Sequence, residues 1–343
     1  MIAIHNSTKG FHPRWIDYCK RQGIPHKIVN CYANDLMEQL KDCRALMWHF
    51  SHSHPKDILI ARQILFALEH TGFGVFPDFR TAWHFDDKVA QKYLLERVNA
   101  PLVPSYVFFD AAEAMQWLRS TSFPKVFKLR GGAGSSNVRL VRDRSLAERL
   151  VKQAFGKGFS NYDPAASFKD RWYHYRSGRA GIMEPVKGLL RFLKPPAYAK
   201  AKGRERNYVY FQDFIPENDS DTRIIVIAGK AFALKRYVRP NDFRASGSGV
   251  FAYGRVEFDE RCIAQAFELT ERLKAQCLAF DFVFNERREP LVVEISYGYT
   301  ATGYDPCPGY WDRQLNWHEG RFDHESWMVD LILESTNGGS GKI

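Results

Sequence analysis

Two acidic side chains near the carboxyl end of the chain stand where an acid is costly. Asp281 and Glu294 interrupt the apolar and aromatic runs LAFDFVF (278–284) and LVVEIS (291–296). The charged segment NERREP separates the two runs, which predicts two adjacent antiparallel strands. A carboxylate in such a strand costs several kcal/mol unless it is paired or bound to a metal. Two interpretations stay open, a pair of acids bridged to basic residues and a metal site.

Basic side chains crowd the stretch that precedes the two acids, and apolar residues surround them. Because two carboxylates cannot neutralise five cations in neighbouring strands, phosphate is the expected counter-ion. The five cations are Arg223, Lys235, Arg236, Arg239 and Arg244.

A glycine-rich stretch, GGAGSSNVRLV (131–141), follows the strand-like run KVFKLR. Such a turn lets backbone N–H groups approach phosphate oxygens, and Lys128 on the strand supplies a matching charge. The same letters also describe an ordinary hairpin, so both interpretations stay open here.

Several segments must position these residues. Residues 1 to about 85 alternate strand runs (IAIH, HKIVN, ALMWHF, FGVFPD) with helical periodicity, which predicts a small parallel α/β domain. No G-x-G-x-x-G follows the first strand, so dinucleotide binding is not supported. Further along, DDKVAQKYLLERV and DAAEAMQWLRS predict helices, VPSYVFF and VYFQDFI predict strands, and FDERCIAQAFELTERLKAQ predicts an amphipathic helix before the acids.

The net charge of +10 is unevenly distributed over the 343 residues. Residues 157–207 contain twelve Lys or Arg against four Asp or Glu, which gives this segment +8. Such a basic excess attracts phosphates, nucleotides or an anionic surface. Within it, IMEPVKGLLRFL has apolar residues at helical spacing, and we favour an amphipathic helix packed on the protein over an interfacial helix or a lid over an anionic substrate. No nucleic-acid-binding motif is legible, so nucleic acid is not an expected partner.

The remaining composition is typical of a cytoplasmic protein. No apolar run approaches the roughly 20 residues of a membrane span, and the first residues do not resemble a signal peptide. The six cysteines have no C-x-x-C spacing and are expected to be reduced thiols. His49, His52 and His54 have no cysteine or carboxylate at ligand spacing, so we favour a structural loop over a metal site there.

Together these stretches resemble the ATP-grasp superfamily, and within it the branch of ribosomal-protein-modifying glutamate ligases and their relatives. The resemblance runs from Lys88 to Ser296, about 60% of the chain. KVFKLRGGAGSSNV is similar to the strand and small loop in which a lysine, here Lys128, holds the α- and β-phosphates. VYFQDFI resembles the hinge strand whose backbone contacts adenine, and DSDTR resembles D-I-R, which implies that Asp221 approaches the ribose and Arg223 faces the transferred phosphate.

The resemblance implies an α+β fold of two subdomains that grip ATP, preceded by the small parallel α/β domain. The expected domains are 1–85, 86–210 with the basic insert 155–207, 211–335 with the metal site, and a flexible tail at 336–343. The implied nucleotide-binding residues are Lys88, Lys128, Gly131, Gly132, Gly134, Ser135, Ser136, Gln212, Asp213, Phe214, Ile215, Asp221 and Ser246. The implied catalytic residues are Arg223, Lys235, Arg236 and Arg244, and the implied metal ligands are Asp281, Glu294 and Ser296.

Two positions depart from the family pattern. Ser246 replaces the asparagine of R-x-N, and Ser296 replaces that of E-x-N. A serine hydroxyl is a weaker and shorter metal ligand than an amide oxygen, so the geometry of a second metal ion is in doubt.

The expected function is an ATP-dependent carboxylate-amine ligase that forms an amide through an acyl phosphate. The implied cofactors are ATP and Mg²⁺, with two ions expected and Mn²⁺ as an alternative. The implied partners are a small-molecule carboxylate and an amine, such as an amino acid, a peptide or a sugar acid, and the oligomeric state stays open with a homodimer among the options. An ATP-grasp small-molecule kinase and a non-catalytic nucleotide-binding module remain alternatives.

The aromatic and polar stretch 297–327 follows the metal strand directly. It suits either an acceptor pocket, with Asp305 and Trp311 in its wall, or a tail that is packed on the core.

Overall fold

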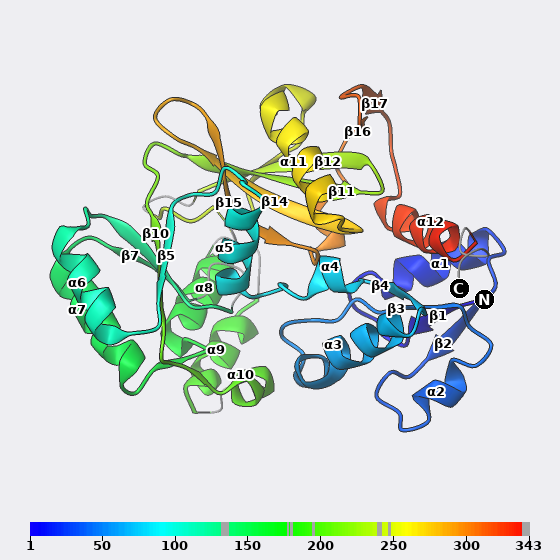
Figure 1. Cartoon of the computed structure of the whole chain (residues 1–343), viewed down its shortest axis with the longest axis horizontal. Coiled ribbons are helices and arrows are strands. Elements are labelled where there is room, and N and C mark those ends of the chain that lie inside the picture. Colours follow the sequence, from blue (N-terminus) through cyan, green and yellow to red (C-terminus); the bar gives the residue numbers. More distant parts are fainter. Residues whose placement is uncertain are drawn as a thin grey trace.

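The computed structural model of the chain describes residues 1–131, 137–176, 178, 181–193, 196–238, 242–245 and 248–337 (Figure 1). Three main sheets are built from residues 2–76, 105–213 and 220–319. The predicted domain boundaries at 85 and 335 fall outside these sheets, whereas the boundary at 210 falls within β10 (Val209–Asp213) of the second sheet. The division into domains remains a prediction, and residues 338–343 of the expected tail lie outside the described part.

The N-terminal sheet is parallel, as the sequence predicts, with the strand order β2-β1-β3-β4. Its apolar strands are β1 (Ile2–His5), β2 (His26–Val29), β3 (Ala45–Met47) and β4 (Gly74–Phe76). Its helices are α1 (His12–Arg21), α2 (Leu36–Gln39), α3 (Pro55–His70) and α4 (Phe79–Ala82). The last helix, α12 (His324–Asn337), returns to this domain and packs beside α1 and β4, so both ends of the chain lie on one side (Figure 1).

The second sheet has the antiparallel order β5-β10-β6-β7. Its strands are β5 (Ser105–Phe108), β6 (Lys125–Lys128), β7 (Val138–Val141) and β10 (Val209–Asp213), and α5 (Lys88–Arg97) precedes them. Helices α6 (Ala111–Ser120) and α7 (Arg144–Phe155) cover one face, where Phe127 and Phe211 are buried against them. Because side chains alternate along a strand, Lys128 and Gln212 point to the opposite face. We call this sheet and its helices the small lobe.

The third sheet has the order β15-β14-β11-β12-β16-β17, with β13 (Phe251–Ala252) beside β12. Its strands are β11 (Ser220–Ile227), β12 (Lys230–Tyr237), β14 (Cys277–Phe284), β15 (Pro290–Ser296), β16 (Gly309–Asp312) and β17 (Trp317–Glu319), with 3-10 turns at Arg255–Glu257 and Ala301–Gly303. The amphipathic helix α11 (Glu260–Leu273) packs on one face against Ile224, Phe280 and Phe282. The alternate residues Arg223 and Asp281 therefore face the other way. We call this unit the large lobe.

The basic segment forms a helical insert whose ends meet in the short pair β8 (Phe159–Ser160) and β9 (Arg204–Glu205). It contains α8 (Pro164–Arg176), α9 (Met183–Leu193) and α10 (Ala197–Lys202), below the two lobes in Figure 1. Helix α9 packs on α8 through Pro185 and Gly188, which are buried, while its large apolar side chains face outward. The favoured expectation, that the apolar face of this helix packs on the protein, is wrong. None of the described helices is long and apolar enough to cross a membrane.

Candidate active site

A cavity of about 440 Å³ lies between the small lobe and the large lobe. Its volume is within the range of small-molecule sites, which is roughly 300 to 1,000 Å³. Residues from both sheets and from the connection before α5 line it. They include His52, Asp86, Lys88, Val126, Lys128, Gln212, Asp213, Phe214, Ile215, Asp221, Arg223, Arg236, Arg244, Asp281, Val283, Glu294 and Ser296.

The large-lobe wall contains one row of charged residues across three neighbouring strands. In this row Arg223 is the cross-strand partner of Asp281, and Asp281 is the partner of Glu294. Directly opposed residues of antiparallel strands have Cβ atoms about 4.5 to 5.5 Å apart on the same face. The two acids predicted from the sequence therefore stand side by side on the cavity wall.

Asp281 is held by two guanidinium groups. The Nε and Nη2 atoms of Arg223 donate to its two carboxylate oxygens at 2.5 and 2.7 Å, and an Nη2 atom of Arg236 lies at 2.9 Å. Burial of Asp281 opposes its ionisation, but the charges of Arg223 and Arg236 hold its pKa well below the usual range. The interpretation of acids bridged to basic residues thus describes Asp281 in this structure.

The other cations of this lobe also have carboxylate partners. Arg236 makes a two-pronged contact with Asp221 at 2.6 and 2.7 Å, and Arg244 lies 2.7 Å from Asp242. Lys235 lies 3.6 Å from Glu257. The expectation that the five cations require phosphate for want of carboxylates is therefore wrong for these side chains, because acids outside the predicted pair neutralise them. Arg239 lies outside the described residues.

The prediction that Lys235 belongs to the site is wrong, because Lys235 is absent from the described residues that line the cavity. It follows directly before Arg236 in the sequence, and Arg236 points into the cavity from β12. Because adjacent side chains of a strand point to opposite faces, Lys235 is directed to the other side of the sheet.

On the small-lobe wall, the ammonium group of Lys128 points toward the same cavity as the acids. Its Nζ donates to Oε1 of Gln212 at 2.5 Å, and Nε2 of Gln212 donates to Oγ of Ser105 at 3.0 Å. Burial lowers the pKa of Lys128 to about 8, opposed by the nearby charge of Glu294 and reinforced by that of Lys88. The predicted lysine is thus a buried cation that loses its proton as the pH rises past about 8.

A second buried lysine, Lys88, also lines the cavity and pairs with an acid of the large-lobe wall. Lys88 at the start of α5 lies 3.1 Å from Glu294, so this acid too is paired with a base in the structure. Burial opposes the charge of Lys88, but Glu294 and Asp86 raise its pKa.

The residues of this site that the sequence interpretation missed include Asp86 and His52. Asp86 is paired with Lys202 of the insert helix α10. A Cβ atom on Gly131 would lie 3.1 Å from both Asp86 Oδ2 and Lys202 Nζ, which explains why a glycine begins the loop there. The acidic pair Asp86-Asp87 directly before α5 could have identified Asp86 from the sequence. No sequence signal identified His52.

The hinge strand ends at the cavity, as the resemblance implies. Asp213, Phe214 and Ile215 all line it, but the carboxylate of Asp213 is turned to Lys125 at 2.6 Å. Phe214 and Val126 both line this wall, and their apolar side chains suit the flat face of a base.

Of the serines in the two departures from the family pattern, Ser296 is described and Ser246 is not. Ser296 lines the cavity, and its hydroxyl donates to the carbonyl of Gly298 at 2.8 Å. The hydroxyl is thus occupied by a local turn rather than directed only at a ligand. The predicted loop residues Gly132, Gly134, Ser135 and Ser136 also lie outside the described part of the chain.

Most of the aromatic stretch 297–327 after β15 packs on the core. Gly298 lines the cavity, whereas none of its described residues from 299 to 327 does. Tyr299 and Tyr304 are buried against Phe232, Trp311 is buried against Phe258, and Asp305 binds Arg14 of α1 at 2.7 Å. The packed-tail interpretation describes this stretch.

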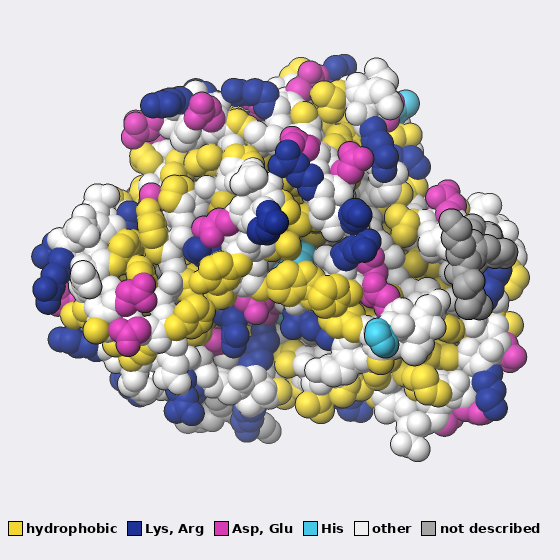
Figure 2. Space-filling model, viewed as in Figure 1, with side chains coloured by type: hydrophobic (Ala, Val, Ile, Leu, Met, Phe, Trp, Pro, Cys, Tyr) yellow, Lys and Arg dark blue, Asp and Glu magenta, His cyan; other side chains and the backbone are white. Residues whose placement is uncertain are grey.

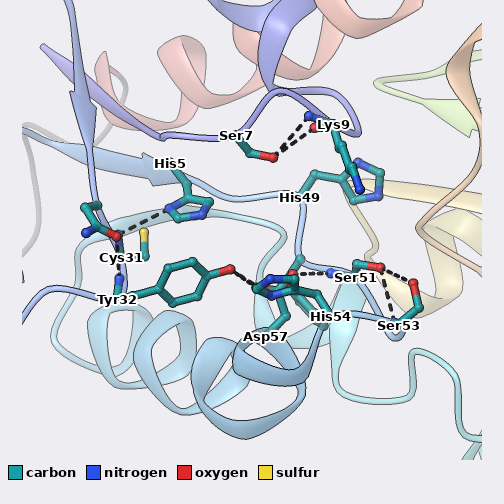
Figure 3. A network of polar contacts seen from close by, with 12 residues as sticks. His5, Ser7, Lys9, Cys31, Tyr32, His49, Ser51, Ser53, His54 and Asp57 are labelled. Atoms are coloured by element: carbon teal, nitrogen blue, oxygen red, sulfur yellow. Dashed lines mark hydrogen bonds and ion pairs between the residues drawn. The ribbon is translucent and has the colours of Figure 1, made fainter. Parts of the chain in front are cut away.

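The histidine loop of the N-terminal domain forms a polar network at the carboxyl edge of its sheet (Figure 3). Nδ1 of His49 accepts from the backbone N–H of Phe11 at 3.0 Å, and burial lowers the pKa of His49 to about 3. His54 and the Tyr32 hydroxyl both lie against the carboxylate of Asp57. Among the described residues no group of three or more potential ligands is arranged to hold a metal ion. These contacts describe a hydrogen-bonded loop, and the preference for a structural role over a metal site remains a prediction.

Comparison with known proteins shows which solved structures have a similar fold. No family model matches the chain. The RimK domain protein ATP-grasp from Sphaerobacter thermophilus is similar in structure, with a TM-score of 0.56, 16% identity, and coverage of 97% of this chain and 100% of that one. The ATP-grasp ligase PsnB in complex with a minimal precursor, Mg and ADP gives a TM-score of 0.54 at 12% identity, with 98% of each chain covered.

The chain therefore has the ATP-grasp fold, preceded by a parallel α/β domain, and the fold that the resemblance implies is confirmed. Among curated proteins it is similar to the alpha-aminoadipate–LysW ligase LysX of Saccharolobus solfataricus. The two are 21% identical over 298 residues, which cover 83% of this chain and 89% of that protein.

Proposed function

We propose that this protein is an ATP-dependent ligase that joins a carboxylate to an amine. The supporting observation is the arrangement of Lys128 on one lobe opposite the row Arg223–Asp281–Glu294 on the other, within one cavity. Residues more than 150 positions apart in the sequence thus meet in a site that has cations for phosphate groups and acids for a metal ion.

In this proposal the base of ATP lies against the apolar wall at Phe214 and Val126, and the phosphates extend toward the charged row. Lys128 contacts the phosphates from the small lobe, and Arg223 and Arg236 contact the transferred phosphoryl group from the large lobe. Guanidinium groups bind phosphate and carboxylate with the same two-pronged geometry, so both arginines can exchange Asp281 for a phosphoryl group.

The charge balance of the site supports a divalent cation. Three cations of the cavity, Lys88, Arg223 and Arg236, are already paired with acids, so an added triphosphate needs further positive charge. Carboxylate oxygens are the ligands that Mg²⁺ prefers, and Asp281 and Glu294 stand side by side on the wall. These residues fit the ion and would hold it, with Ser296 as an additional candidate. When bound, Mg²⁺ neutralises charge on the β- and γ-phosphates.

The residues of the chain position the reactants and stabilise charge. A carboxylate oxygen of the substrate attacks the γ-phosphorus, the bond to the β-phosphate oxygen breaks, and ADP leaves. Arg223 and Arg236 stabilise the charge on the phosphoryl group during transfer. The amine then attacks the acyl carbon, inorganic phosphate leaves with the bonding electrons, and the new amide nitrogen loses a proton.

The expected substrates belong to the classes named by the resemblance, an amino acid, a peptide or a sugar acid. LysX is named as a ligase of alpha-aminoadipate and LysW, and PsnB is described with a precursor, so relatives of this fold act on both small acids and polypeptides.

The test is to incubate the purified protein with ATP, Mg²⁺ and pooled acids and amines, and to follow both phosphate release and product mass. A ligase releases phosphate together with ADP, whereas a kinase retains the phosphoryl group on its product. Glu294→Gln should abolish turnover, and Lys235→Ala is the matched control because it changes a cation of the same sheet outside the cavity. Turnover in Glu294→Gln equal to that of the wild type would contradict the metal role. Failure of the wild type to bind nucleotide at all would contradict the proposal.

A further inference from the structure

Helix α9 exposes large apolar side chains that a protein of this size normally buries. Met183, Leu189 and Leu190 are each 60% exposed. Ile182, Val186 and Phe192 are also exposed. A cluster of this kind on one short helix marks an interaction site rather than chance exposure.

The packing of α9 explains why these side chains face outward. Pro185 and Gly188 are buried on the side that contacts α8. A Cβ atom on Gly188 would lie 3.1 Å from the ring of Phe168 and 3.2 Å from Cδ of Arg171, so the two helices are in close contact there. The small residues of α9 thus face the protein, and the large ones remain available to a partner.

The exposed residues form a continuous stripe. At 100° per residue, Ile182, Met183, Val186, Leu189 and Leu190 fall within an arc of about 120°. Lys187 and Arg191 lie beyond one edge of this arc, at about 40° and 80° from it. Trp172 of α8 is 43% exposed and extends the apolar surface. Both Trp172 and Phe192 contact the ring of Phe168.

The charge around this stripe is strongly positive. Residues 157–207 contribute +8 of the net +10 of the chain. The acids of the insert whose side chains are described have basic partners, since Glu184 contacts Arg171 and Lys187, and Asp163 and Glu205 lie near Arg139 and Arg130. In Figure 2, Lys and Arg side chains gather along the lower margin, where Figure 1 places the insert helices. The partner of the stripe is therefore expected to be negatively charged.

We propose that α9 lies in the headgroup region of an anionic lipid bilayer, with its stripe directed toward the acyl chains. An aliphatic stripe bordered by Lys and Arg is typical of interfacial helices. Nucleic acid would match the charge but would leave the aliphatic side chains in water, whereas an anionic bilayer accommodates both. None of the described helices can span a membrane, so this attachment is peripheral. It is independent of the proposed ligase activity.

The test measures binding of the full chain to vesicles by co-sedimentation. Vesicles of phosphatidylcholine with phosphatidylglycerol are compared with vesicles of phosphatidylcholine alone, each at low and high salt. We expect binding to the anionic vesicles that weakens as salt screens the charges. Equal or absent binding to the two kinds of vesicle would overturn the proposal.

Leu189→Glu combined with Leu190→Glu replaces two large side chains of the stripe without altering the core, because both are exposed. The vesicle partition coefficient should fall by about tenfold or more, since two leucines that the bilayer would bury are replaced by two acids that the anionic headgroups repel. Leu59→Glu is the control, because Leu59 is 70% exposed on helix α3, outside the stripe, and this variant should bind as the wild type does. Circular dichroism and the unfolding midpoint verify that both variants are folded.

Sedimentation equilibrium without lipid distinguishes the main rival, a second copy of the chain. We expect the wild type and the double variant to have the same mass in solution. A wild-type dimer that the double variant abolishes, together with no preference for anionic vesicles, would show that the stripe joins two copies and would overturn the proposal.

Discussion

The affinity for ATP should fall as the pH rises past about 8, because Lys128 then loses its proton. Burial lowers the pKa of this lysine to about 8 in the structure without nucleotide. A bound triphosphate stabilises the charged form, so the pKa in the complex is higher and binding is accompanied by proton uptake. The protonated lysine is the binding-competent form, and it predominates below pH 8.

The size of the effect follows from this pKa. Each pH unit above 8 should raise the apparent dissociation constant by up to about tenfold, which gives roughly 25-fold between pH 7.5 and 9.5. The other groups around the lysine do not titrate in this range. The pKa of Lys88 is raised, and that of His52 is lowered by burial, so the former stays charged and the latter neutral.

The assay is isothermal titration calorimetry with Mg²⁺ and a non-hydrolysable ATP analogue at several pH values, in buffers of different ionisation enthalpy. The dependence of the heat on the buffer gives the number of protons taken up. Lys128→Arg is the control, because a guanidinium group remains charged throughout this range. Its affinity should be independent of pH even if it is lower overall. A wild-type affinity that is unchanged up to pH 9.5, or an arginine variant with the same pH profile, would refute the reasoning.

Three further predictions follow from the charge pairs. Asp281→Ala should abolish turnover and also lower the free energy of unfolding by about 3 to 5 kcal/mol, because Arg223 and Arg236 are left buried without this carboxylate; urea unfolding that matches the wild type would contradict this. Lys235→Ala should retain wild-type kcat and KM in steady-state assays, and a large loss of kcat would return this residue to the site. Asp305→Asn should cost at most about 1 kcal/mol in thermal unfolding and leave substrate KM unchanged, since its partner Arg14 lies on α1, and an altered KM would restore the acceptor-pocket interpretation.

Much of the fold could be predicted from the sequence because local patterns determine it. The strand runs of residues 1 to 85 alternate with helices, and those of β1 and β3 are fully buried, a pattern typical of a parallel sheet. The pairing of the two acid-bearing strands was equally accessible, since a short charged segment joins two apolar runs.

The site could be predicted only in part from the sequence. Asp281 and Glu294 could be identified because an acid in an apolar strand needs a partner. Their actual partners could not, because Arg223 and Lys88 reach them from strands and helices remote in sequence. Lys235 is a different case, since the alternation of side chains in a strand already indicated that it and its neighbour Arg236 face opposite ways.

The orientation of α9 was beyond the sequence for a physical reason. Periodicity indicates that the helix has an apolar face, but it does not indicate what covers that face. In the structure Gly188 permits close contact with α8 on another side of the helix, and that contact determines which side chains are exposed. A small residue opposite an apolar stripe was the available signal.

The central claim is that acids from the large lobe and a lysine from the small lobe bind one magnesium–nucleotide complex. The most direct measurement is the affinity of a non-hydrolysable ATP analogue, with and without Mg²⁺, for the wild type, Lys128→Ala and Glu294→Gln. We predict that Mg²⁺ strengthens binding to the wild type, that this gain is lost in Glu294→Gln, and that Lys128→Ala binds at least about tenfold more weakly under both conditions. Three proteins with equal affinities and equal responses to Mg²⁺ would contradict the claim.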